Sequence, residues 1–460
     1  MLFSLLCYAA WAGDSALPGD ATTPPAALSP AASALSAGMI AVQDKRLDDA
    51  RAAFERCIAA EPTAEQCAWE LGWVHWSQRD WSRVVARWES LATLNAAYPK
   101  LDANLAIARD QLKLQRLAAE MRAKAPASFV STAPVGTTLR LRAVGDMMIG
   151  SAFPTGELPL DGGAASFASV ASLLADADVT FGNLEGPLCD TDQPSDKCNP
   201  NGAPGACYAF RTPRAYAHWY KDAGFDLLST ANNHAFDFGE ACRTQTESAL
   251  DGMGIRWSGR AGTFASWKHG EQRLAMVGFH TADTANNLND LDTATTIVRG
   301  LAADHDIVIV SFHGGAEGSK AIHVPQGPET FYGENRGDLR TFTHAVVDAG
   351  ADLVLGHGPH VLRAFEGYKG RLIAYSLGNF ATYGRFNLSG NQGIGAILEV
   401  TMGRSGEFLT GTLHGTVQEG EGIPVPDPSN RAADLVRVLG AEDFARSTMQ
   451  IAQDGTLKLP

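Results

Sequence analysis

The stretch Ile307-Val-Ile-Val-Ser-Phe-His313 is a nearly continuous apolar run that ends in a histidine. Five further strand-like runs also end in polar residues, namely Gly145-Asp146, Asn183-Leu-Glu185, Asn232-Asn-His234, His357-Gly-Pro-His360 and Ser376-Leu-Gly-Asn379. Apolar runs of this length, separated by helical patterns, are typical of buried strands in an α/β sheet. Ligands of open α/β sheets bind outside the carboxyl ends of the strands. The sequence therefore predicts that these polar clusters converge at one edge of one sheet.

The clusters combine carboxylates, amides and imidazoles, a ligand mixture that suits one or two divalent transition metals. Glu185 is followed by Gly186-Pro187 directly after a strand, where a carboxylate has little structural purpose. His357 and His360 lie on a loop shaped by Gly and Pro, which favours a shared metal over core packing. Two alternatives remain open at this point. A helix N-cap is the alternative role for Asp146 or Glu185, and the lone His313 fits a structural role as well as a functional one.

The motif Asn232-Asn233-His234-x-x-Asp237 is the most specific of the clusters. The amide oxygen of Asn233 suits a metal, and His234 suits a proton donor whose tautomer Asp237 fixes. The alternative is an Asx-turn with a satisfied histidine.

The composition is that of a globular protein. The chain has 460 residues, 45% of them hydrophobic and 19% charged, enough for two or three domains. Its formal net charge is -14, from 37 basic and 51 acidic residues without a long acidic run. This balance disfavours a nucleic-acid-binding groove, which needs clustered Lys and Arg.

Residues 1–12 resemble a secretory signal peptide without a basic start. Ala10-Trp-Ala12 has the small-x-small form of a cleavage site, and no other segment is long and apolar enough to cross a membrane. A lipoprotein signal through Cys7 fits less well. A misassigned start codon or an unstructured N-terminus also remains open. A periplasmic or secreted location is the expectation.

Without Cys7 the chain keeps six cysteines, an even number. Cys57 and Cys67 bracket a helical turn. The other four surround a Gly-, Pro- and Asn-rich insertion: Cys189, Cys198, Cys207 and Cys242. Their wide, irregular spacing differs from that of C-x-x-C zinc pairs. The sequence predicts disulfide bonds formed in an oxidising compartment and leaves their connectivity open.

The rest of the chain divides by composition. Residues 13–35 form a linker rich in Ala, Pro, Ser and Thr, and residues 36–124 have helical periodicity. A second linker follows over residues 125–137, and an α/β domain over residues 138–460. The alternating pattern after Gly393 predicts a second sheet or an edge hairpin.

Two segments of the helical region are similar at an offset close to that of a tetratricopeptide repeat, which is about 34 residues. Trp69-Glu-Leu71-Gly72 resembles the signature of that repeat. A final helix over about residues 101–123 is expected to cap the stack. We interpret the tryptophans at 69, 73, 76, 81 and 88 as helix–helix core rather than a ligand groove. The repeats are a candidate platform for a protein partner or for the catalytic domain.

From about Leu139 to Phe380 the chain resembles the poly-gamma-glutamate capsule-biosynthesis (CapA-type) family, a branch of the metallophosphatase superfamily. The matching motifs follow in order: Gly145-Asp146-Met-Met148, Asn183-Leu-Glu-Gly-Pro187, Ala231-Asn-Asn-His234 with Asp237 and Gly239, His313-x-Gly315-x-Glu317, Gly356-His-x-Pro-His-Val361 and Tyr375-Ser-Leu-Gly-Asn-Phe380. The resemblance implies a metallophosphatase-like α/β/β/α sandwich, preceded here by the small all-α repeat domain.

The resemblance also implies roles for individual residues. The implied ligands of one or two divalent metals (Mn, Fe or Zn) are Asp146, Glu185, Asn233, His313, His357 and His360. His234 is the implied acid that protonates a leaving group after attack on phosphorus or carbonyl carbon, with Asp237 beside it. Supporting positions around the ligands are Asn183, Asn232, Glu317, Ser376 and Asn379. Candidate contacts for an anionic substrate, chosen for their closeness to the motifs in sequence, are Arg363 and Arg385, with Arg211 and Arg214.

The chain departs from the usual patterns at several positions. Met148 stands where metallophosphatases usually have His, so one metal site is a ligand short. The spacing His357-x-x-His360 is one residue longer than their Gly-His-x-His. Where the capsule family usually has Trp, a second His and Gln, this chain has Gly314, Gly358 and Arg363.

Three hypotheses follow for the function. The first is a metal-dependent hydrolase that makes or processes an anionic capsule or envelope polymer of the poly-gamma-glutamate type. The second is a non-catalytic assembly or export factor for such a polymer, with the repeats recruiting other proteins. The third is a general metallophosphodiesterase acting on phosphoesters.

Overall fold

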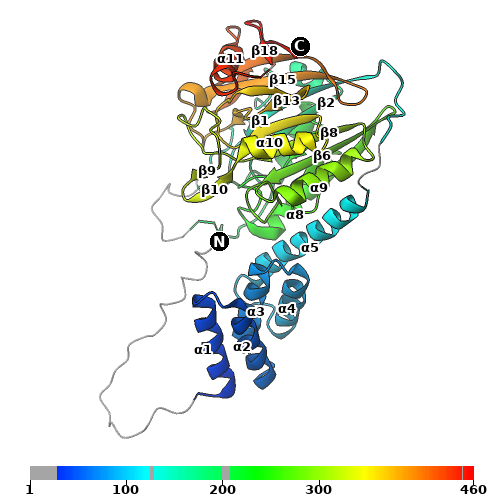
Figure 1. Ribbon diagram of the computed structural model, residues 1–460. Helices are drawn as coiled ribbons and strands as arrows, with labels where there is room; N and C mark the ends of the chain where they lie inside the picture. The colour runs from blue at the N-terminus through cyan, green and yellow to red at the C-terminus, as the bar shows by residue number, and fades with distance from the viewer. Residues whose placement is uncertain are drawn as a thin grey trace. The chain divides into compact units, whose positions relative to one another are not determined.

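The computed structural model describes residues 28–124, 129–154, 156–195, 197–198, 208–447 and 449–459 (Figure 1). They form two compact units that divide between Asn95 and Ala96. The predicted signal peptide, and residues 13–27 of the first linker, lie outside the described residues. The helical part begins earlier than predicted, because Ser29 accepts a hydrogen bond from the amide of Ala32 and caps a helix that starts at Pro30.

The first unit consists of two helical hairpins. Its helices are α1 (Pro30–Gln43), α2 (Leu47–Ala60), α3 (Glu65–Ser77) and α4 (Trp81–Leu94). The two hairpins pack by the same device. A Cβ on Gly38 would overlap the Phe54 ring, and a Cβ on Gly72 would overlap the Trp88 ring. Gly72 lies 34 positions after Gly38, and Trp88 lies 34 positions after Phe54. This repetition in three dimensions supports the predicted repeat.

Two of the five tryptophans are buried as predicted for helix–helix core, namely Trp81 and Trp88, whereas Trp69, Trp73 and Trp76 are only partly buried. Trp88 is fully buried, and its ring centroid lies 5.0 Å from that of Trp69, 5.2 Å from that of Trp73 and 5.6 Å from that of Trp76. A disulfide bond between Cys57 and Cys67 joins α2 to α3.

The second unit contains two large sheets. The strands of the first are β1 (Thr138–Met148), β2 (Val179–Leu184), β3 (Leu227–Ser229), β4 (Arg256–Ser258), β14 (Asn379–Thr382), β15 (Ile394–Gly403), β16 (Phe408–Glu419), β17 (Ile423–Pro426), β18 (Gln450–Ile451) and β19 (Thr456–Lys458). Their order is β18-β19-β16-β15-β1-β2-β3-β4, with β14 beside β1 and β17 beside β16. The strands β14, β1, β2, β3 and β4 form the parallel pairs of this sheet, whereas β15 runs antiparallel to β1.

The strands of the second sheet are β5 (Ala265–His269), β6 (Gln272–His280), β7 (Asn286–Asn287), β8 (Ile307–His313), β11 (Leu353–His357), β12 (Phe365–Tyr368) and β13 (Arg371–Ala374). Their order is β12-β13-β11-β8-β6-β5, with β7 beside β6. The four central strands of this order, from β13 to β6, are parallel. A small separate hairpin is formed by β9 (Glu329–Phe331) and β10 (Glu334–Gly337).

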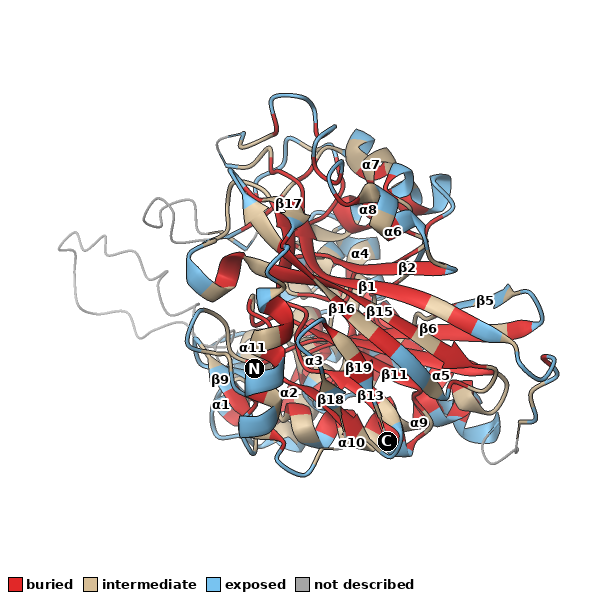
Figure 2. Cartoon of the chain, turned by 90° about the horizontal axis from the view of Figure 1, so that it is seen from above, coloured by how far each residue is buried: buried red, intermediate tan, exposed pale blue. Residues whose placement is uncertain are grey.

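The two sheets pack face to face with helices on both outer sides, which confirms the predicted α/β/β/α sandwich. Apolar side chains of both sheets meet in one core, including Leu141 and Phe181 from the first and Ile309 and Leu355 from the second. The outer face of the first sheet packs against α6 (Ala171–Ala175), α7 (Ala217–Asp222) and α8 (Gly239–Gly252). The outer face of the second packs against α5 (Leu101–Lys124), α9 (Leu291–Ala302) and α10 (Leu339–Asp348). Figure 2 shows that the central strands are buried along most of their length.

Helix α5 belongs to the second unit, although the sequence analysis grouped it with the repeats. A Cβ on Gly300 of α9 would overlap Met121 of α5, so the two helices approach closely. Asp110 of α5 pairs with Arg243 of α8, with 5% and 4% of the two residues exposed. The compact units therefore divide before this helix, not after residue 124.

The C-terminal part follows the predicted alternation. β15 and β16 pair along most of their length at one side of the first sheet, and α11 (Arg431–Asp443) packs beside them. Among the helices of the described residues, none has the length and apolar composition needed to cross a membrane.

Candidate metal centre

The polar clusters come together at the ends of strands from both sheets, which corrects the prediction of a single sheet. Asp146, Asn183 and Asn379 belong to strands of the first sheet, whereas His313 and His357 end strands of the second. An apolar run shows that a strand is buried, but it does not show which of two stacked sheets contains it. The convergence at the strand ends itself was predicted.

Asp146 lies at the centre of the site because β1 runs between β14 and β2. It is in register with Asn379 on one side and Asn183 on the other. A Cβ on Gly145 would overlap the carbonyl oxygen of Gly378, so only glycine allows this close approach. Asp146 is fully buried, and its Oδ1 accepts a hydrogen bond of 2.8 Å from the Asn183 side chain.

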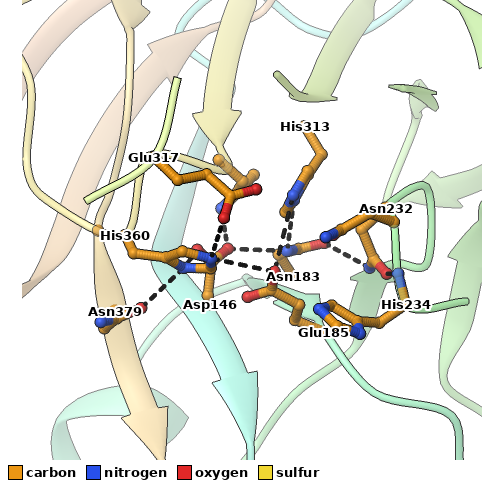
Figure 3. A network of polar contacts seen from close by, with 12 residues as sticks. Asp146, Asn183, Glu185, Asn232, His234, His313, Glu317, His360 and Asn379 are labelled. Carbon is orange, nitrogen blue, oxygen red and sulfur yellow. Dashed lines mark hydrogen bonds and ion pairs between the residues drawn. The ribbon is translucent and has the colours of Figure 1, made fainter. Parts of the chain in front are cut away.

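Three histidines and a second carboxylate surround Asp146. His357 Nδ1 lies 3.3 Å from Asp146 Oδ1, and His360 Nδ1 lies 3.1 Å from Asp146 Oδ2. Glu185 Oε1 lies 3.6 Å from His313 Nε2 and 3.6 Å from His360 Nε2 (Figure 3). One ligand atom each from Asp146, Glu185 and His360 fit within 4.8 Å of one another. This separation suits side chains that share an ion.

Several of these ligand atoms are buried without a hydrogen-bond partner. They are both carboxylate oxygens of Glu185, both ring nitrogens of His357, Nε2 of His313 and the amide oxygen of Asn233. A buried carboxylate without a partner is destabilising by several kcal/mol. Each of these side chains offers a lone pair to a cation, with one ring nitrogen from each imidazole, and oxygen with imidazole nitrogen is the donor set of Mn, Fe or Zn sites. The residues therefore fit the predicted metal on structural grounds.

The titration of these groups reflects the same crowding. Burial, followed by the charge of Asp146, raises the pKa of Glu185 well above its usual range. Burial lowers the pKa of His313, which keeps its imidazole neutral. Burial would also lower the pKa of His360, but the carboxylates of Glu185 and Asp146 outweigh it and raise that pKa to about 10. Without a bound cation, the carboxyl groups of Asp146 and Glu185 favour a positive charge nearby, and the proton held by His360 provides it.

Asn232 connects two of the strand ends. Its side-chain nitrogen donates to Asn183 Oδ1 at 3.1 Å and to the Leu184 carbonyl at 2.8 Å, while its oxygen accepts from the His234 amide at 3.1 Å. The last contact is an Asx-turn, which was the alternative interpretation of this motif. The turn does not use Asn233, whose buried amide oxygen stays without a partner. The turn therefore supports the site by holding Asn233 and His234 in place.

His234 is oriented by Asp237, as the sequence predicted. Its Nδ1 lies 2.7 Å from Asp237 Oδ2, which also accepts from the Phe210 amide at 2.8 Å. The His234 ring packs on the Phe210 ring with centroids 4.2 Å apart. Burial lowers the pKa of His234, and the charge of Asp237 opposes that shift. Asp237 thus holds the ring through Nδ1.

Sequence reasoning missed two groups around His234. Lys197 donates to Asp237 Oδ1 at 2.9 Å and to the Asn233 carbonyl at 3.1 Å. The Phe386 ring packs on both Phe210 and His360, with centroids 5.3 and 5.2 Å apart. Lys197 lies in the cysteine-rich insertion, which is tied to α8 by the Cys189–Cys242 disulfide. Those cysteines marked the insertion in the sequence but gave no sign that it reaches the site.

The supporting residues fall into two groups. Asn379 Oδ1 lies 3.0 Å from His360 Nδ1, and Glu317 Oε2 lies 3.8 Å from His360 Nε2, so both adjoin the cluster. Ser376 does not adjoin it. Its hydroxyl donates to the Val361 carbonyl and accepts from the Gly378 amide, so it shapes the turn before Asn379.

The predicted contacts for an anionic substrate need correction at Arg363. This residue is completely buried, and its guanidinium donates to both carboxylate oxygens of Glu329 at 2.8 Å and to the carbonyls of Ala316 and Ala321. All three guanidinium nitrogens are used in holding the loop after β8, so none is left to bind a polymer. Arg385 lies 3.8 Å from Glu157 and over the Tyr208 ring, and its side chain is 10% exposed.

Comparison with known proteins gives the family. The family described as "Bacterial capsule synthesis protein PGA_cap" matches residues 140–383, more than half of the 460 residues, and this segment contains every candidate metal ligand. The chain belongs to this bacterial capsule synthesis family.

Relatives of this chain point to the same family. The chain is 26% identical over 307 residues to the capsule biosynthesis protein CapA of Bacillus anthracis, covering 64% of this chain and 71% of that protein. It is 33% identical over 164 residues to the PGA biosynthesis protein CapA of Bacillus subtilis, covering 35% of this chain and 43% of that one. A probable polyglutamine synthesis accessory protein of Mycobacterium tuberculosis is 29% identical over 180 residues, covering 33% of this chain and 44% of that protein.

Among solved structures, a purple acid phosphatase from yellow lupin covers 63% of this chain and 54% of its own, with 9% identity and a TM-score of 0.32.

Proposed function

We propose that this protein is a metal-dependent hydrolase of capsule or envelope polymer metabolism. It would hold one or two divalent transition metals through Asp146, Glu185, Asn233, His313, His357 and His360. The observation that supports this most directly is the set of buried, unpartnered ligand atoms on Glu185, Asn233, His313 and His357. Without a bound cation, such a cluster destabilises the folded protein. A bound cation would take up these lone pairs and remove that cost.

When bound, such a metal supplies Lewis-acid polarisation of a phosphoryl or carbonyl oxygen and a lowered pKa for an attacking water. The chain's own residues would supply the remaining steps. His234 Nε2 would donate a proton to the leaving group, because Nδ1 is held by Asp237 at 2.7 Å. The Phe210 and Phe386 rings, which cover His234 and His360, would limit the access of water on that side.

The substrate class is proposed from the relatives. Two of them are named for capsule or PGA biosynthesis, which supports a capsule polymer as the substrate. The disulfides Cys57–Cys67 and Cys189–Cys242 support an oxidising compartment, and therefore a periplasmic or secreted location.

A second candidate is a non-catalytic assembly or export factor that guides the polymer, with the repeats binding a protein partner. The observation in its favour is Met148. It is fully buried at the end of β1 and packs on Gly186, where metallophosphatases usually place a ligand histidine. A weakened second metal position would reduce hydrolysis more than polymer binding.

Substitution of the proposed acid separates the two candidates. The metal-loaded chain would be tested for cleavage of bis(4-nitrophenyl) phosphate and of poly-γ-glutamate. A hydrolase is expected to lose turnover in His234→Ala while its metal content is unchanged, because the ring is no metal ligand. His323→Ala is a matched control, since that half-exposed histidine pairs with Asp443 outside the site. Equal turnover of wild type and His234→Ala, or cellular polymer formation that survives the substitution, would favour the assembly factor.

A further inference from the structure

Arg336 lies on the hairpin that follows the His313 strand. It belongs to β10, and its carbonyl accepts a hydrogen bond of 2.8 Å from the Gly315 amide, so the hairpin holds the loop directly after β8. The residue is 2% exposed. No role was predicted for it, because it follows no apolar run and matches no motif.

The guanidinium of Arg336 is buried with unused donors. Its Nη2 lies 2.9 Å from Glu317 Oε1 and its Nη1 lies 3.9 Å from Glu334 Oε2. Neither Nε nor Nη2 makes a hydrogen bond, since the Glu317 oxygen lies outside the directions in which the N–H groups point. The charge of Arg336 is paired with Glu317, but leaving its buried Nε and Nη2 without a hydrogen bond is costly, so a further acceptor is indicated.

The other buried arginines in the described part of the chain show what full pairing is like here. Arg142 donates through all three nitrogens to Glu399, Asp176 and the Leu173 carbonyl. Arg243 and Arg363 are paired in the same way with carboxylates and carbonyls. Arg336 is the exception among these four, and it is the one beside the candidate metal centre.

Two contacts connect Arg336 to the cluster. Glu317 pairs with Arg336 through Oε1 and lies 3.8 Å from His360 Nε2 through Oε2. The guanidinium is thus separated from a candidate ligand by a single side chain.

The unused nitrogens have the geometry for one class of ligand. Nε and Nη2 form one edge of the guanidinium and direct two N–H groups in parallel, which matches the two oxygens of a carboxylate or phosphate. We propose that this edge of Arg336 binds an oxyanion of the substrate beside the metal centre, in the role that the sequence analysis gave to Arg363. The proposal rests on the proposed function, and it restricts the substrate to one with an acidic group close to the bond that is cleaved.

Calorimetric titration of the full, metal-loaded chain tests this with three probes: inorganic phosphate, a γ-linked glutamate oligomer and a γ-linked glutamine oligomer of equal length. Arg336→Met is expected to weaken binding of an anionic probe on the order of 10- to 100-fold, because two charge-assisted hydrogen bonds are lost. Its affinity for the neutral glutamine oligomer and its metal content should match wild type. Loss of phosphate binding would identify a phosphoester substrate, and loss of glutamate-oligomer binding would identify a polymer carboxylate.

Two further variants separate recognition from simple charge balance. Arg336→Lys keeps the charge without the parallel donors, so it should bind the anionic probe less tightly than wild type. Glu334→Gln is the control on the same hairpin, with its carboxylate 72% exposed, and should bind as wild type does. If Arg336→Met and Arg336→Lys both bind the anionic probes as wild type does, the proposal is wrong. If Arg336→Met fails to fold, the affinity of Arg336→Lys for the anionic probes, compared with that of wild type, decides alone.

The failure of the proposed function would be visible separately. A wild-type chain that holds no metal would remove the hydrolase, but titration of the metal-free chain would still compare Arg336 with its variants. Weaker anion binding in those variants would then support an oxyanion site in a polymer-binding protein. Unchanged binding would overturn both proposals.

Discussion

Asp237→Asn tests how the proposed acid is supported, because it changes charge and hardly changes shape. Asp237 Oδ2 accepts from the His234 ring at 2.7 Å and the Phe210 amide at 2.8 Å, and Oδ1 accepts from Lys197 at 2.9 Å. All three partners are donors. An asparagine can offer its oxygen to only one side, so its amide group must face either the Lys197 ammonium or the Phe210 amide and the His234 ring. The substitution therefore removes the hydrogen bonds to the Asp237 carboxylate either on the Lys197 side or on the side of Phe210 and His234.

A hydrogen bond to a charged group contributes about 1.5–3 kcal/mol, and about 1.4 kcal/mol corresponds to a tenfold change. Loss of the carboxylate beside His234 should therefore lower kcat by about 10- to 100-fold, through a less stable protonated imidazole. Metal content should stay at the wild-type value, because Asp237 does not adjoin the cluster of ligands.

The assay is steady-state hydrolysis of bis(4-nitrophenyl) phosphate, with elemental analysis of the same preparations. Asp427→Asn is the matched control. Asp427 is also buried, at 9% exposure against 1% for Asp237, and it also accepts from backbone amides and an arginine, but it lies by α11. A kcat for Asp237→Asn within twofold of wild type, with metal intact, would refute the role given to His234 and Asp237.

Three further predictions concern stability. Arg363→Met should lower the free energy of unfolding by about 3–5 kcal/mol, because it leaves Glu329 buried without its partner; urea denaturation measures this, and a loss of polymer affinity without destabilisation would contradict the structural role. Replacing Cys189 and Cys242 by serine opens a link between residues 53 positions apart and should cost about 4 kcal/mol in the same assay; an unchanged unfolding midpoint would argue against the disulfide. Burial raises the pKa of Asp352 from 3.8 to about 7. Between these values the folded state keeps a proton that the unfolded state releases. The contribution of Asp352 to the unfolding free energy is therefore complete below about pH 4 and is lost as the pH rises to about 7. Asp352→Asn should flatten the pH dependence of the unfolding free energy over that range, and an equally steep dependence in the variant would remove the assignment.

The sequence predicted the strands of the site well, for a physical reason. Each ligand follows a strand buried on both faces, and such strands read as short apolar runs that end abruptly in polar residues. The ends of β1, β2, β8 and β11 were all recognisable in this way. The division of these strands between two sheets was not, since burial looks the same in either sheet.

Residues that do not follow an apolar run were harder to predict. Arg363 follows a motif by two positions, and closeness in sequence suggested a role at the site, yet its side chain turns into the protein to meet Glu329. Arg336 lies on a short hairpin with no periodic pattern, and it reaches the cluster only through the fold. Lys197 likewise arrives from an irregular insertion. Such contacts depend on tertiary packing, which local pattern does not report.

Helix α5 shows the same limit for domain boundaries. Its periodicity continues that of the repeats, so the sequence grouped it with them. Its contacts with α8 and α9, including the ion pair between Asp110 and Arg243, place it in the second compact unit. These contacts join residues 133 positions apart, a separation that no local pattern reveals.

The most direct test of the central claim is the metal content of the purified chain, measured by elemental analysis for wild type, Asp146→Ala and His357→Ala. Asp146 and His357 are both fully buried in the cluster, so their loss should remove ligands without changing the surface. The account predicts about one or two equivalents of a divalent transition metal in wild type, lost or strongly reduced in both variants. Wild-type protein that holds no metal, even after reconstitution with Mn, Fe and Zn, would contradict it.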